Sequence, residues 1–140
     1  NLSVKCLCRL AAILAILPCA PAAEWTIPLA GNTFRTAPAP SGDGLQRNGT
    51  LRWSDAEAVF SVFFHASAPA QVNLSLVGRA PEGSSTVRVQ AVGREFTLPI
   101  DQPESREYPI GEIEIPKAGY VRVDLQGLKK SGPVFLEARD

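Results

Sequence analysis

The chain has 140 residues, and its 14 Lys and Arg side chains balance 14 Asp and Glu side chains. A surface without excess charge does not favour nucleic acid or an anionic membrane as the partner. The length suits one domain, and an apolar content of 45% is enough for a hydrophobic core.

The first 22 residues are typical of a secretory signal peptide. Lys5 and Arg9 precede the apolar run "LAAILAIL", and Ala20-Pro21-Ala22 fits the A-x-A cleavage pattern. An apolar run of about eight residues is far shorter than the roughly 20 that a membrane-spanning helix needs. We therefore expect cleavage after Ala22, a secreted, periplasmic or cell-surface location, and no membrane span.

Cys19 offers an alternative, because a cysteine after an apolar run can be a lipidation site. Pro18 disfavours lipidation, since such signals take a small residue at that position. The other cysteines, Cys6 and Cys8, also lie in the predicted signal, so residues 23–140 have no thiol for a disulfide. We expect these residues to form one domain, and the end at Asp140 leaves room for a further C-terminal domain.

Residues 23–140 alternate polar and apolar side chains with a period of two, and no long window has helical periodicity. The strands predicted in chain order lie within "AGNTFRTAP", "LRWSDAEAVFSVFFHA", "QVNLSLVGRA", the hairpin "STVRVQAVGREFTLPI", "REYPIGEIEI", "AGYVRVDLQGLKK" and "GPVFLEA". A loop rich in Gly and Pro, residues 36–50, is expected to cross between two sheets. Eight or nine short strands predict an all-β fold, an antiparallel β-sandwich of jelly-roll type.

The most hydrophobic predicted strand runs from Ala58 to His65. One of its faces is apolar enough for the core, and the opposite face carries Val59, Phe63 and His65. Two interpretations of the second face remain open. Either another segment of the chain covers Phe63, or the face is an exposed platform for a ligand or a neighbouring domain.

The sequence shows no constellation typical of an enzyme. His65 is the only histidine, and no G-x-S-x-G, H-E-x-x-H or phosphate-binding glycine loop is present. Glu112 and Glu114 alternate along one predicted strand, where solvated carboxylates are ordinary. We expect a non-catalytic protein, with a small glycoside hydrolase that uses carboxylates from distant strands as the least favoured alternative.

No cofactor is indicated, and calcium is the one metal considered. Glu24 with Glu137 or Asp140 could tie the two ends of a sandwich together through calcium, an idea that rests on fold analogy. Asp43 and Asn48 lie in a glycine-rich loop but lack the spacing of an EF-hand.

Binding of a polysaccharide or another glycan needs an aromatic face for the sugar ring and planar polar groups around it. Trp53 provides the aromatic face at the point where a loop becomes a strand, with Arg52 and Asp55 as partners for sugar hydroxyls. Trp25 is a second aromatic candidate. The competing interpretation of Trp53 is a core residue that closes the end of the sandwich.

In the stretch "AGYVRVDLQGLKKSG", Tyr120 follows Gly119. We expect its hydroxyl to bond back to the backbone, as in a tyrosine corner. Arg122 and Asp124 then lie on the solvated side of a half-buried strand and can pair with each other.

The run from "WSDAEAVFSVFF" to "GYVRVDLQGLKKSG" resembles the galactose-binding-like β-sandwich of carbohydrate-binding modules, which implies glycan binding. Together with "IPLAGNTFRTAP" it is similar to a secreted bacterial domain of unknown function that precedes a larger uncharacterised domain. That resemblance implies export and a C-terminal partner domain, and it transfers no site residues. Two functions follow as expectations: an exported glycan-binding module that supports an attached domain, or an interaction module that packs on that domain and binds no sugar.

Overall fold

The computed structural model describes residues 24–37 and 42–140 of the protein. The predicted signal peptide, its cleavage after Ala22 and the alternative lipidation of Cys19 lie outside these residues. In the described part of the chain, no helix has the length and apolar character needed to cross a membrane.

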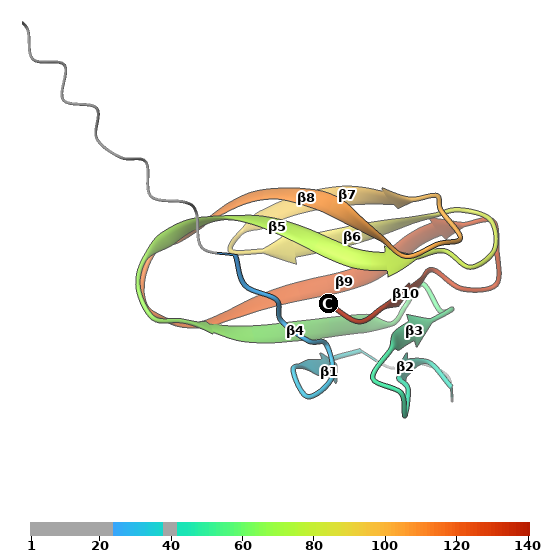
Figure 1. Ribbon diagram of the computed structural model, residues 1–140, viewed down its shortest axis with the longest axis horizontal. Helices are drawn as coiled ribbons and strands as arrows, with labels where there is room; N and C mark the ends of the chain where they lie inside the picture. The colour runs from blue at the N-terminus through green and yellow to red at the C-terminus, as the bar shows by residue number, and fades with distance from the viewer. Residues whose placement is uncertain (1–23, 38–41) are drawn as a thin grey trace, which may run out of the picture.

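The chain forms a sandwich of two five-stranded sheets, which confirms the predicted all-β antiparallel fold (Figure 1). Sheet A has the strand order β1-β4-β9-β6-β7, and sheet B has the order β2-β3-β10-β5-β8. The strands of sheet A are β1 (Thr33–Arg35), β4 (Val59–Ala66), β9 (Gly119–Lys130), β6 (Ser85–Ala91) and β7 (Arg94–Ile100). Those of sheet B are β2 (Gly44–Leu45), β3 (Leu51–Trp53), β10 (Leu136–Ala138), β5 (Ala70–Arg79) and β8 (Arg106–Ile115).

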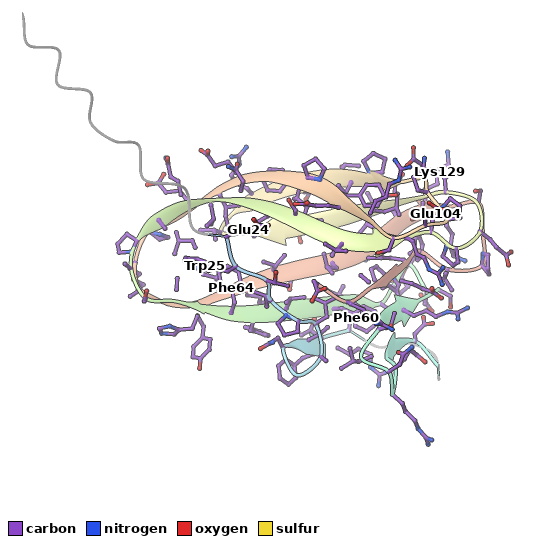
Figure 2. The ribbon with its side chains drawn as sticks, in the orientation of Figure 1. Glu24, Trp25, Phe60, Phe64, Glu104 and Lys129 are labelled. Atoms are coloured by element: carbon purple, nitrogen blue, oxygen red, sulfur yellow. The ribbon has the colours of Figure 1, made fainter. Side chains whose placement is uncertain are left out.

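Alternation along each strand determines which side chains enter the core. On β9, Val121, Val123 and Leu125 are buried, and the residues between them face outward. On β4, Phe60 and Phe64 lie on the side that faces the other sheet (Figure 2). Each large apolar side chain buried in this way contributes roughly 1.5–3 kcal/mol. The two inner faces together form one continuous core.

The hairpin of β6 and β7 forms as the sequence predicts. Its strands pair from Ser85 opposite Ile100 to Ala91 opposite Arg94. The two turn residues, Val92 and Gly93, have φ angles of 49° and 73°. Positive φ at both central positions is typical of a type I′ turn, whose twist matches that of the flanking strands.

The chain crosses from sheet A to sheet B between β1 and β2, as expected for the loop of residues 36–50. Residues 38–41 of this loop lie outside the described part. Asp43 anchors the later part of the loop of residues 36–50. The Asp43 carboxylate accepts hydrogen bonds from the Ser54 amide and hydroxyl and from the Asp55 amide. The segment before β1 is anchored to sheet B, since buried Leu29 donates its N–H to the Arg139 carbonyl at 2.8 Å.

Candidate functional site

Trp53 is a core residue. Its side chain has no exposed area, and its ring centroid lies 5.3 Å from that of Phe60 and 6.3 Å from that of Phe135. Its indole Nε1 has no hydrogen-bond partner within the described residues. A sugar cannot reach either face of this ring, so the expected stacking role of Trp53 is excluded by its burial.

The other predicted sugar-binding residues do not gather around Trp53. Arg52 points to the outer face of sheet B, where its Nη1 lies 3.3 Å from Oε1 of Glu137. The Asp55 carboxylate accepts the Glu57 amide at 2.7 Å and so shapes the turn that precedes β4. Trp25 is 59% exposed and lies beside Glu24 in the segment before β1 (Figure 2).

The calcium candidates do not form a metal site. Among the described residues, no three His, Cys, Asp or Glu side chains come together as ligands. The Glu137 carboxylate is already held by Arg79 at 2.7 Å and by Arg52, two cations that disfavour a third. Asp140 contributes its backbone carbonyl, which accepts the Val77 amide. The structure therefore does not form the expected calcium site of Glu24 with Glu137 or Asp140 among its described residues.

The outer face of sheet A carries four ring side chains, here called the aromatic strip: Phe34, Phe63, His65 and Tyr120. Phe34 on β1 meets Phe63 on β4 edge to face, with ring centroids 5.9 Å apart. His65 on β4 meets Tyr120 on β9 in the same manner at 5.2 Å. Phe34 is 56% exposed and Tyr120 is 81% exposed. The strip therefore presents ring surface to solvent at both of its ends.

The predicted interaction face of Val59, Phe63 and His65 thus lies on one side of β4, where Phe34 partly covers Phe63. The sequence left open whether another segment covers Phe63 or whether this face is exposed. Phe63 is covered in part and exposed in part. The expected tyrosine corner is wrong, because the Tyr120 side chain points into solvent and packs on His65.

A polar row of Ser61, Arg122 and Asp124 lies next to the aromatic strip. Asp124 Oδ1 accepts hydrogen bonds from Ser61 Oγ at 2.5 Å and from Arg122 Nε at 2.7 Å. Ser61 is buried although it faces outward, and its hydroxyl also lies 3.0 Å from Thr36 Oγ1. These contacts fix the orientation of the Asp124 carboxylate and the Arg122 guanidinium. The remaining carboxylate oxygen, Oδ2, has no partner among the described residues.

The strand register explains why the aromatic strip and the polar row lie side by side. Phe34 pairs with Ser61, and Ser61 pairs with Asp124, so the three share one line across the sheet. His65 pairs with Tyr120 four residues further along β4, about 13 Å away at the usual rise of a strand. The face is therefore long enough for an extended ligand with alternating apolar and hydroxyl surfaces.

No curated protein sequence is detectably similar to the chain. A family model described as a domain of unknown function, DUF5077, matches residues 27–140. The match includes the ten strands found in the described part of the chain and both outer faces of the sandwich. The chain therefore belongs to the DUF5077 family of domains of unknown function.

Proposed function

We propose that the protein is an exported, non-catalytic module that binds a glycan on the outer face of sheet A. The observation that carries this proposal is the aromatic strip beside the polar row. Export is supported by the signal-like residues 1–22. The resemblance to carbohydrate-binding modules favours the same function.

The two parts of the site suit the two sides of a sugar. The C–H face of a pyranose ring is apolar and packs on aromatic rings such as those of Phe34 and Tyr120. Its hydroxyl edge needs planar donors and acceptors, which Arg122 and Asp124 supply in fixed orientations. Because Ser61 holds the Asp124 carboxylate and Asp124 in turn pairs with Arg122, a ligand bears less of the entropy cost of ordering these side chains.

A second function uses the same face. Val59, Phe63 and Phe34 form an apolar surface that could pack against an attached domain, as the alternative of an interaction module requires. The high exposure of Tyr120 and the polar row beside it favour the glycan instead, since a docking surface is depleted of charge at its centre.

The test is binding of the purified protein to a panel of soluble polysaccharides, measured by retardation in affinity gels. Tyr120→Ala and Phe34→Ala should each weaken binding by about tenfold, because each removes a stacking surface. Leu45→Ala is the matched control, since Leu45 is a large exposed apolar residue of sheet B.

Retardation that survives both strip substitutions would place the ligand elsewhere on the protein. Absence of retardation by every polysaccharide, with protein that is folded by circular dichroism, would contradict glycan binding itself. Binding of a separately produced attached domain, lost on Phe63→Ala, would support the interaction module instead.

A further inference from the structure

A second surface of the protein has the shape and charge of a ligand site. The outer face of sheet B has a hollow of about 640 Å³, within the size range of small-molecule sites. It lies over β3, β10 and β5, on the other side of the sandwich from the aromatic strip. Its lining consists of Gln46, Asn48, Thr50, Arg52, Val77, Arg79, Ser105, Glu137, Ala138, Arg139 and Asp140.

The charge of this hollow is organised around Glu137. Its Oε2 accepts hydrogen bonds from Nε and Nη2 of Arg79 at 2.9 and 2.7 Å, and its Oε1 lies 3.3 Å from Arg52 Nη1. The Glu137 side chain is only 15% exposed, whereas the two arginines are nearly half exposed. Glu137 therefore lies beneath two guanidiniums and holds them in place toward solvent.

Arginine is the commonest residue type among the described residues of the lining. Arg139 is a third guanidinium, and its Nε donates to Thr50 Oγ1 at 3.2 Å. Three arginines line the hollow together with the carboxylates of Glu137 and Asp140, and two of them, Arg52 and Arg79, are already paired with Glu137. A guanidinium has more N–H donors than these contacts use, and its planar fork fits the two oxygens of a carboxylate.

The neutral part of the lining indicates what carries the carboxylate. The hollow is much larger than one carboxylate group, and its remaining side chains are mainly amides and hydroxyls from Gln46, Asn48, Thr50 and Ser105. Among the described residues that line it, none is aromatic, and Val77 is the one large apolar side chain. Such a lining suits a ligand with many hydroxyl groups and little apolar surface.

We propose that this hollow binds a uronic acid residue of an acidic saccharide, with Arg52 and Arg139 as the ligands of its carboxylate. Arg79 positions Glu137, and Glu137 in turn orients Arg52. The neutral amide and hydroxyl side chains bind the sugar hydroxyls. This site is separate from the aromatic strip, so the proposal for one can be wrong while the proposal for the other holds.

The experiment titrates the purified protein with trimers of galacturonic, mannuronic and glucuronic acid by isothermal calorimetry. At least one trimer should bind, and added salt should weaken its binding because the attraction is electrostatic and partly exposed. Arg52→Gln and Arg139→Gln should each reduce the affinity at least tenfold. Arg88→Gln on sheet A, where the Arg88 guanidinium pairs with Glu95, is the matched control and should change the affinity less than twofold.

Two comparison ligands separate the chemistries. The methyl ester of the bound trimer should bind at least tenfold more weakly, and inorganic sulfate more weakly still. Equal binding of the ester would overturn the role of the carboxylate, and equal binding of sulfate would overturn the saccharide. The proposal is also overturned if no trimer binds the folded protein, or if both arginine variants bind normally.

Discussion

Asp124 is the residue on which the polar half of the sheet A site depends. Its carboxylate accepts one hydrogen bond from buried Ser61 and one from Arg122. Hydrogen bonds to a charged group are worth roughly 1.5–3 kcal/mol each when buried. Arg122 is half exposed, so solvent reduces its share well below that range. Ser61 therefore does more than Arg122 to hold the carboxylate in place.

Substitution of Trp53 tests the packing of the core at a single residue. Trp53→Ala should lower the free energy of unfolding by about 3–5 kcal/mol, because it leaves a cavity beside Phe60 and Phe135. Removal of the unpaired indole N–H offsets a small part of this loss. Urea unfolding followed by circular dichroism measures the change. Trp25→Ala, at an exposed position, should stay within about 0.5 kcal/mol of the unsubstituted protein.

Stability of Trp53→Ala equal to that of the unsubstituted protein would contradict the core position of the indole. A specific loss of glycan binding by stable, folded Trp53→Ala protein would restore the stacking role that its burial excludes.

Among the elements, β9 joins the core to both parts of the proposed site. It lies between β4 and β6 in sheet A, so it is paired along both edges. Its inner face packs against sheet B, and its outer face carries Tyr120, Arg122 and Asp124. Near its end, Gly127 leaves room for the ring of Phe135, which also packs on Trp53.

Gly127→Ala tests this contact between β9 and the segment before β10. A Cβ at residue 127 would lie closer than 3.0 Å to three ring atoms of Phe135. We expect a loss of about 1–3 kcal/mol in the free energy of unfolding, because the core must shift to admit the methyl group. Lys129→Ala, on the exposed part of the same strand (Figure 2), should change it by less than about 0.5 kcal/mol. Equal midpoints of urea unfolding for the two variants would contradict the close approach of the Phe135 ring to Gly127.

Alternation made most strands predictable, because a half-buried strand shows its period in the sequence itself. The hairpin of β6 and β7 and the strand β9 were predictable on this basis. The strand β2 was not, since its two residues are too few to show a period. The meeting of Phe34 with Phe63, and of Arg52 with Glu137, depends on which strands pair. Pairing is a tertiary property, so neither candidate site could be assembled from local pattern alone.

Trp53 and Tyr120 show the same limit in single residues. Both lie near the start or end of a strand beside polar neighbours, and local sequence does not say on which face each ring falls. Leu51 and Trp53 of β3 both face inward, whereas Tyr120 faces outward opposite His65. The register of β9 against β4 therefore determines that the Tyr120 ring lies on the outer face of sheet A, where it is exposed.

At the scale of the whole molecule, the sandwich has two outer faces of different chemistry. Sheet A presents ring surfaces beside an ion pair, and sheet B presents a charged hollow in which none of the described lining residues is aromatic. The core between them holds both faces in fixed positions, since the buried side chains of the two sheets form one cluster. The two proposals together describe a module that binds a different ligand on each face.

The central claim is that a glycan binds on the outer face of sheet A. Amide NMR spectra of the isotopically labelled protein, recorded during titration with the polysaccharides of the panel, test it most directly. We predict that the shifted amides cluster at Phe34, Phe63, Tyr120 and Arg122, and that Leu45 on sheet B does not shift. The claim is contradicted if no polysaccharide shifts the amides of β1, β4 and β9, or if the shifts lie only on sheet B.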